Sequence, residues 1–389
     1  MNKSMAEMHR IRSADSVSPI CMPSEIRVDR FLDSSPPTRT WILENLLPLG
    51  IVGLLAASGG TGKSLLTLQL ALSVATGQSF LGIKVKSPGG VLMICAEDDS
   101  DELHRRFAGI VSAMRRHGQF GKKEEAAVRD KLYIASRVGG DNLMTRVHQG
   151  KVERTDIGER IALTAGQIND IKLIVLDPVS RFRGGDENNN DHATRFVESV
   201  EALRATTEAS ILMPHHIHKD ARKDKSAMIT AANVRGATAL VDGVRWVATM
   251  DVLSMDCAKR KCGIEPNEAL NYVRFDVVKN NYAAHWEGMW TRRQPDGLLV
   301  PVDIKTIGQK KARQQKEEEY QNFVPKLKKF IELENAESRP VTRRGLRKHA
   351  GLNKTFGVSD HSIREFVPKA IADGHIHEVL NGRHKELKL

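Results

Sequence analysis

The sequence predicts an α/β protein with a doubly wound, mostly parallel sheet that carries helices on both faces. The candidate strand at 90–96 is a continuous apolar run without alternation, which indicates burial on both faces of a parallel sheet. Helical stretches separate the candidate strands along the chain. The main strands are expected at 51–56, 90–96, 172–176, 210–214, 244–250 and 272–278, and the main helices at 64–76, 102–116 and 192–207.

A glycine-rich turn follows the first of these strands and has the sequence Ala57-Ser-Gly-Gly-Thr-Gly-Lys-Ser64. This pattern is typical of a phosphate-binding loop, although Ala57 stands where the strict pattern has glycine. We expect Lys63 to neutralise the β- and γ-phosphates of ATP and the Ser64 hydroxyl to bind Mg²⁺. The alternative is a turn between strand and helix that binds nothing. The predicted nucleotide-binding residues are Ser58, Gly59, Gly60, Thr61, Gly62, Lys63, Ser64 and Leu65.

Carboxylates end the next two buried strands, where ligands of a doubly wound sheet bind. Glu97 is the candidate general base that activates the attacking water. The alternative is that an acid here caps the following helix, which is the favoured role for Asp98 and Asp99. Asp177 ends an apolar strand about 110 residues after the loop. This is the Walker B pattern, so Asp177 is predicted to hold Mg²⁺ together with Ser64.

Two histidines, His215 and His216, end the strand at 210–214. A neutral imidazole there suits recognition of the γ-phosphate, and metal binding with His218 is the alternative. Later in the domain, Arg245 and Lys279 lie at strand ends. They are either partners in internal salt bridges or cations that reach the nucleotide of a neighbouring subunit.

Composition describes a soluble globular protein, with 40% hydrophobic and 28% charged residues. No apolar run approaches a membrane span, the N-terminus does not resemble a signal peptide, and four cysteines fit a reducing cytoplasm. The formal net charge is +11, and residues 310–389 hold 18 Lys and Arg against 11 Asp and Glu. This asymmetry indicates a polyanionic partner, although a well-solvated tail has the same signature.

Together these motifs resemble the RepA-type hexameric replicative helicases of plasmids, a RecA/DnaB-like group of P-loop ATPases. The resemblance extends from Trp41 to Val302. It is carried by the segments ASGGTGKS, VLMICAEDD, ELHRRF, LIVLDPVSRF, the histidine pair, RGATALVDGVRW and VVKNNY.

The resemblance implies a homo-hexameric ring with ATP between subunits and single-stranded DNA in a central channel. It implies that Glu97, Asp177 and His216 act in hydrolysis, Arg245 as an arginine finger and Lys279 as a lysine finger. An initiator or a primase would be a further partner. The loops 181–192 and 217–233 would line the channel, and their candidate DNA-binding residues are Arg181, Arg183, Lys219, Arg222 and Lys223.

The resemblance does not cover the C-terminal segment, so its fold is predicted from local signals. We expect a helix at 311–334 that is interrupted near Pro325, helices at 342–349 and 359–373, and a hairpin with its turn at Asn381-Gly382. This order is that of a winged helix-turn-helix. Duplex DNA is the favoured partner, and protein contact is the alternative. The candidate DNA-binding residues are Arg343, Arg344, Arg347, Lys348, Arg364 and Arg383.

The predicted organisation is therefore a flexible arm at 1–38, an ATPase domain at 39–305 and a DNA-binding domain at 306–389. The favoured function is an ATP-dependent DNA helicase of a plasmid or another mobile element. The alternative is a DNA-binding ATPase without helicase activity that acts as a replication initiator, a partition protein or a regulator.

Overall fold

The computed structural model describes residues 20–217, 238–351, 353–381 and 384–389. The chain divides into two compact units, Met1–Thr40 and Trp41–Leu389. In the first unit the described residues contain one short helix, α2 (Asp29–Leu32). No helix in the described ranges is both long enough and apolar enough to cross a membrane.

A nine-stranded mixed sheet forms the centre of the second unit, with the order β13-β12-β11-β10-β3-β9-β8-β4-β5. The strands from β10 to β5 are parallel to one another, and β11, β12 and β13 extend the sheet in antiparallel pairing. The predicted α/β fold with a mostly parallel sheet is confirmed. The strands are β3 (Val52–Ala57), β4 (Gly90–Cys95), β5 (Leu132–Ser136), β8 (Ile171–Asp177), β9 (Ser210–His216), β10 (Trp246–Val252), β11 (Tyr272–Asn280), β12 (Met289–Arg293) and β13 (Leu299–Val302).

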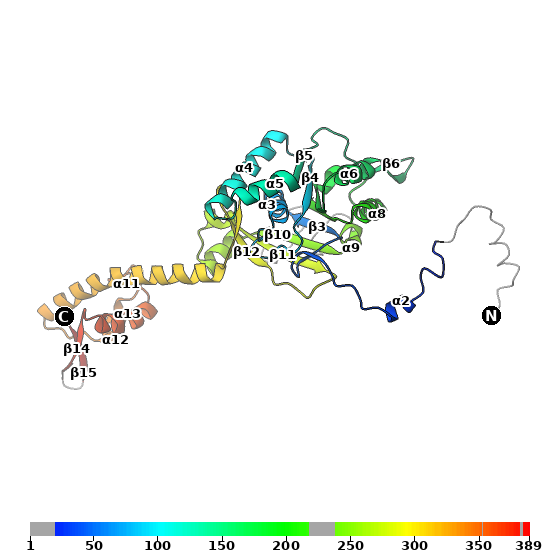
Figure 1. Cartoon of the computed structure of the whole chain (residues 1–389). Helices are drawn as coiled ribbons and strands as arrows, with labels where there is room; N and C mark the ends of the chain where they lie inside the picture. The colour runs from blue at the N-terminus through cyan, green and yellow to red at the C-terminus, as the bar shows by residue number, and fades with distance from the viewer. Residues whose placement is uncertain (1–19, 218–237, 352, 382–383) are drawn as a thin grey trace. The chain divides into compact units, whose positions relative to one another are not determined.

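Helices cover both faces of this sheet (Figure 1). One hydrophobic cluster joins the first face to α3 (Lys63–Thr76) and α4 (Ser100–Arg116), beside α5 (Lys122–Lys131). A second cluster joins the other face to the remaining helices of the domain. These are α6 (Ile157–Ala165), α7 (Val179–Phe182), α8 (Asn190–Thr207) and α9 (Thr238–Gly243). Strands buried on both faces therefore lack alternation of apolar and polar residues, as the sequence indicated.

Several short elements complete the domain, and the sequence did not predict them. Two are hairpins, β1 (Trp41–Leu43) with β2 (Leu47–Pro48), and β6 (Thr145–His148) with β7 (Lys151–Arg154). The others are short helical turns, α10 (Met255–Cys257), η3 (Ala258–Cys262) and η4 (Pro266–Asn271). The segment 180–190 was expected to contain no regular structure, but α7 occupies its start because Val179 and Phe182 are buried beneath it.

The C-terminal segment has its own hydrophobic core and the expected order of three helical segments and a hairpin. Its elements are α11 (Ile304–Ala336), α12 (Arg343–Leu346), η5 (Arg347–His349), α13 (Asp360–Ala372), β14 (His377–Asn381) and β15 (His384–Lys388). Ser359 caps α13 by accepting from the Ser362 N–H at 3.0 Å, and Gly374 follows the helix with φ +74°, as predicted. Gly382, the second residue of the predicted hairpin turn, lies outside the described residues.

Helix α11 differs from the prediction, because it begins at Ile304 and continues through Pro325 without a break. Proline removes one helical hydrogen bond, but apolar side chains on both sides of it in the sequence are buried. Phe323 and Leu327 are fully buried in the C-terminal core. Their burial holds the helix together across the proline.

Candidate nucleotide-binding site

The glycine-rich turn joins the end of β3, the strand between β10 and β9, to the start of α3. Gly60 and Gly62 have φ values of +75° and +103°, which a side chain would strain. Gly62 is also the N-cap of α3, so the helix N-terminus opens at the turn. Backbone N–H groups at such a terminus favour an anion, and this arrangement fits a triphosphate.

Lys63 is only 6% exposed and bends back over the turn. Its Nζ donates to the carbonyls of Ala57 at 2.9 Å and Ser58 at 3.2 Å, and lies 3.2 Å from Nδ1 of His216. Burial lowers the pKa of Lys63 to about 8, although Asp177 and Glu97 favour its charged form. The ammonium is therefore held at the turn by acceptors that an incoming phosphate would replace.

Ser64 and Asp177 come together although 113 positions separate them, because β8 ends beside the start of α3. The Ser64 hydroxyl hydrogen bonds to the Asp177 carboxylate. Burial raises the pKa of Asp177 to about 6. A hydroxyl and a carboxylate oxygen next to a phosphate turn are the donors that Mg²⁺ prefers, so these residues fit the ion.

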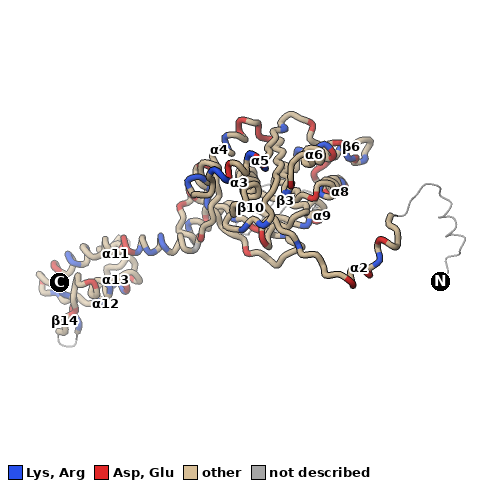
Figure 2. The backbone as a smooth tube through the Cα atoms, viewed as in Figure 1, with Lys and Arg blue, Asp and Glu red and all other residues tan. Residues whose placement is uncertain are grey.

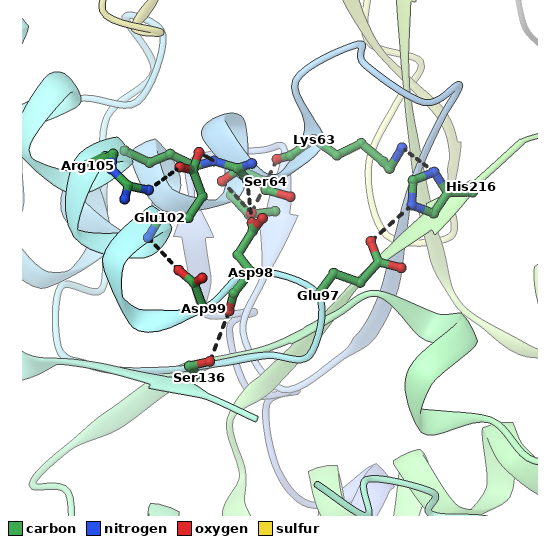
Figure 3. A network of polar contacts seen from close by, with 11 residues as sticks. Lys63, Ser64, Glu97, Asp98, Asp99, Glu102, Arg105, Ser136 and His216 are labelled. Atoms are coloured by element: carbon green, nitrogen blue, oxygen red, sulfur yellow. Dashed lines mark hydrogen bonds and ion pairs between the residues drawn. The ribbon is translucent and has the colours of Figure 1, made fainter. Parts of the chain in front are cut away.

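Glu97 follows β4 and lies across the site from Lys63 (Figure 3). Its Oε2 is 3.7 Å from Nε2 of His216, and its Oε1 is 3.5 Å from Nε of Arg181. Burial and the charge of Lys63 lower the pKa of His216 below its ordinary value, which favours the neutral imidazole that we predicted. The strand ends thus bring a carboxylate and an imidazole to the expected position of the γ-phosphate.

The two aspartates after Glu97 have different roles. Asp99 is the N-cap of α4 and accepts from the Glu102 N–H at 2.8 Å, as predicted. Asp98 was also expected to cap, but its carboxylate pairs with Arg106 (Figure 3 shows its surroundings). Burial raises the pKa of Asp98, and its charge acts on Asp177. Asp98 therefore belongs to the acidic side of the site.

The histidine pair does not form a metal centre with other described residues. His215 is buried, and His216 faces Lys63 and Glu97. Within the described ranges, no group of three or more His, Cys, Asp or Glu side chains could hold a metal ion. His218, the third residue of the metal alternative, lies outside these ranges.

Arg245 and Lys279 lie at the opposite edge of the sheet from the phosphate turn. The Arg245 N–H donates to the Val52 carbonyl at the start of β3, whereas the turn follows its end. Lys279 pairs with Val247 across β10 and β11. Its Nζ donates to the Val241 and Asp242 carbonyls at 3.0 and 3.1 Å, so it also closes the end of α9.

Two of the five predicted DNA-binding residues of the ATPase domain, Arg181 and Arg183, lie within the described residues. Arg181 is exposed but pairs with Glu97. Arg183 is 8% exposed and donates to the carbonyls of Asp186 and Asn189, so it holds the conformation of its own loop. The prediction that it contacts DNA requires an exposed side chain, and in this conformation the side chain is buried. The remaining candidates, Lys219, Arg222 and Lys223, lie outside the described residues.

In the C-terminal segment three of the six candidate residues form ion pairs. Arg343 makes a bidentate pair with Glu378, and Arg347 and Arg364 share Asp360. Arg344 and Lys348 are exposed, and Arg383 lies outside the described residues. Further Lys and Arg positions recur along α11, with acidic positions between them (Figure 2).

One arginine at the site was missed by the sequence analysis. Arg293, the last residue of β12, donates through its terminal nitrogen to the Thr61 carbonyl and, at 3.4 Å, to the Gly60 carbonyl. The contact spans 232 positions, and the local sequence around Arg293 matches no motif. Arg293 reaches the turn because β12 pairs with β11 at the side of the sheet, and both strands are far from the turn in the sequence. Knowledge of that pairing would have been needed to predict the contact.

Two solved structures have folds similar to that of this chain: one is an ATPase domain, and the other is a DnaB-like replicative helicase, described together with its interactions with primase. The first has 10% identity and a TM-score of 0.49 and covers 78% of this chain and 100% of its own. The second has 12% identity and a TM-score of 0.48 and covers 77% and 71%. Neither likeness is strong enough to support a functional argument.

The family comparison is more informative, because residues 18–222 match the family model for the AAA domain. This range covers more than half of the chain and contains Lys63, Ser64, Glu97, Asp177 and His216. An AAA domain implies binding and hydrolysis of ATP, in agreement with the geometry of the phosphate turn. This chain belongs to the AAA domain family.

Proposed function

We propose that this protein is an ATP-driven DNA helicase of a plasmid or another mobile element. In this proposal it assembles as a ring, expected to be a hexamer, and moves along single-stranded DNA. The observation that supports it best is the position of Arg245. This exposed side chain leaves the sheet at the start of β10, one strand length away from the phosphate turn of its own chain.

A strand of six residues spans about 16 Å between its first and last Cα atoms, so Arg245 cannot reach the nucleotide of its own subunit. An arginine finger supplied by a neighbouring subunit stabilises the charge that develops on the transferred phosphoryl group. Such a residue is useful only where ATP lies between subunits. The motif order from Trp41 to Val302 also favours a RecA/DnaB-like ring.

The residues of the site then have separate roles. Lys63 and the N–H groups of the turn bind phosphate. Ser64 and Asp177 would hold Mg²⁺, which would supply positive charge beside the phosphate oxygens. Glu97 orients a water molecule and accepts its proton. His216, as a neutral ring that donates from Nε2, senses the γ-phosphate.

For the C-terminal segment we propose a winged helix-turn-helix that binds duplex DNA. The order of helices and hairpin and the surplus of basic residues support this assignment. An initiator or a primase is a candidate partner of the assembled ring.

Strand displacement on a forked duplex tests the main proposal, with Lys63→Ala as the inactive control. Displacement that requires ATP hydrolysis is expected from the unmodified protein and not from the variant. Hydrolysis stimulated by DNA without displacement would instead favour an ATPase that acts as an initiator, a partition protein or a regulator.

A further inference from the structure

Arg293 reaches the phosphate turn from outside the ATP-binding motifs. Its terminal nitrogen contacts two consecutive carbonyls, those of Gly60 and Thr61. In a trans peptide the C=O of one residue and the N–H of the next point in opposite directions. A cation that holds these two carbonyls on its own side therefore directs the N–H groups of Thr61 and Gly62 to the other side of the turn. There the Thr61 N–H makes a long hydrogen bond to the Ser58 carbonyl, at 3.4 Å, which a phosphate would have to replace.

We propose that Arg293 is a positioning residue for ATP binding, which keeps the N–H groups of the turn directed at the phosphates. The role rests on the nucleotide site and does not depend on helicase activity. Arg293 itself does not touch the nucleotide in this proposal. It acts through the peptide units of the turn.

Gly62 shows how closely the guanidinium approaches the turn. A Cβ atom at Gly62 would lie 2.9 Å from the terminal nitrogen of Arg293, which is too close for a real contact. The positive φ of Gly62 also excludes most side chains. The backbone of Gly62 therefore favours glycine, and the guanidinium of Arg293 packs closely against the side of the residue that has no side chain.

The strand hairpin that carries Arg293 is firmly attached to the phosphate-binding helix. Gln69 of α3 donates to the Leu299 carbonyl at 3.0 Å and accepts from the Leu299 N–H at 3.1 Å, and both bonds are buried. Gly297, in the turn of the hairpin, packs on Leu65 of α3. Asp296 also pairs with Arg116 of α4. These contacts attach the hairpin that carries the Arg293 guanidinium to α3.

Arg292 provides a matched control. Neighbouring residues of a strand point to opposite faces, and Arg292 pairs with Glu268 at 3.8 Å and lies over the Tyr272 ring at 5.7 Å. Arg292→Ala therefore removes the same charge from the same strand without touching the turn. A general effect of lost charge or of a weakened strand would appear in both variants.

The test measures the affinity of the full chain for ADP and ATP, in the presence of a chelator that removes divalent metal ions. It compares the unmodified protein with Arg293→Ala, Arg293→Lys and Arg292→Ala. Because charged hydrogen bonds to the turn are lost, Arg293→Ala should bind both nucleotides about tenfold or more weakly. The lysine variant retains one donor and should fall between it and the unmodified protein. The alanine variant should recover affinity when guanidinium ions are added at millimolar concentration, and its kcat at saturating ATP should change much less than its KM.

Unchanged nucleotide affinity in Arg293→Ala would overturn the proposal. So would an equal loss in Arg292→Ala, or a fall in kcat with normal affinity. If the alanine variant does not fold, the lysine variant decides: affinity equal to that of the unmodified protein would overturn the proposal, and a loss of a few fold would support it. If the unmodified protein binds nucleotides but does not displace strands, that result would count against the helicase proposal and not against the role of Arg293.

Discussion

The Nζ atom of Lys63 lies 3.2 Å from Nδ1 of His216, a residue that follows it by 153 positions. A charged lysine can only donate, so Nδ1 accepts and the neutral ring carries its proton on Nε2. That nitrogen faces Glu97 at 3.7 Å. The pair therefore fixes which side of the imidazole can donate to a γ-phosphate or to the carboxylate.

The first prediction concerns the pH dependence of ATP binding. Burial places the pKa of Lys63 at about 8, and the phosphates require its charged form. Below pH 8 the ammonium is already present, whereas above pH 8 binding must also take up a proton. The ATP dissociation constant, measured with a chelator present to remove divalent metal ions, should therefore rise above pH 8 by up to about tenfold per pH unit.

Lys63→Arg is the control for this experiment, because a guanidinium keeps its charge throughout the range. The arginine variant should bind more weakly than the unmodified protein but with little change between pH 7 and 9.5. A constant dissociation constant in the unmodified protein would mean that Lys63 stays protonated over the whole range.

The second prediction separates binding from hydrolysis. Glu97→Gln keeps the shape of the side chain and removes the base, so ATP affinity should stay within a few fold while turnover falls about 100-fold or more. Radiolabelled phosphate release and nucleotide titration measure the two quantities. Asp98→Asn is the comparison, because Asp98 pairs with Arg106 and does not face His216. Normal hydrolysis in the glutamine variant together with lost hydrolysis in the asparagine variant would move the base to Asp98.

The third prediction tests action between subunits. Arg245→Ala and Lys63→Ala should each be inactive alone, but a mixture contains interfaces with an intact turn and an intact arginine. Those interfaces should recover measurable hydrolysis, since such fingers are worth on the order of 10³-fold in rate. Arg274→Ala is a control, because Arg274 pairs with Asp276 within its own chain. Mixtures that never exceed their parent variants would show that Arg245 does not act in trans.

Local patterns predicted the parts of the site that each lie within one short segment. Lys63 and Ser64 follow a glycine-rich turn, and Glu97, Asp177 and His216 end apolar strands, so their neighbours alone identify them. In a parallel sheet these ends meet at one edge, which explains why these side chains lie near one another in the structure.

The features that sequence analysis missed depend on contacts between distant segments. Arg293 contacts Thr61 only because β12 extends the sheet by antiparallel pairing, and no spacing rule predicts such an extension. Arg183 was predicted to contact DNA because the family resemblance places the loop 181–192 in the channel, but its burial depends on how that loop closes. Pro325 was predicted to break α11, but burial of the neighbouring side chains outweighs the lost hydrogen bond.

The last prediction compares two adjacent arginines of the C-terminal segment. Arg343 joins α12 to the hairpin through its bidentate pair with Glu378, at 2.7 and 2.9 Å. Arg344 is exposed and makes no ion pair within the described part of the chain. If the segment binds duplex DNA, Arg344 is free to contact phosphate at no structural cost, whereas Arg343 would first have to leave Glu378.

Arg344→Ala should therefore weaken duplex binding and make its salt dependence shallower by about one unit for the phosphate contact that is lost. Arg343→Ala should mainly lower the stability of the segment, by less than about 1 kcal/mol because the pair is exposed. Fluorescence anisotropy at several salt concentrations measures the first effect, and thermal unfolding measures the second.

Deletion from residue 312 extends this test to the whole segment. It keeps Ile304 and Ile307, which pack in a cluster of the ATPase domain, and removes the C-terminal core, which begins at Tyr320. Hydrolysis stimulated by single-stranded DNA should persist, because every residue of the nucleotide site precedes the cut, while duplex affinity should fall. A truncated protein that binds duplex as tightly as the full chain would instead identify the segment as a site for a protein partner, since its basic residues would then contribute nothing to DNA affinity.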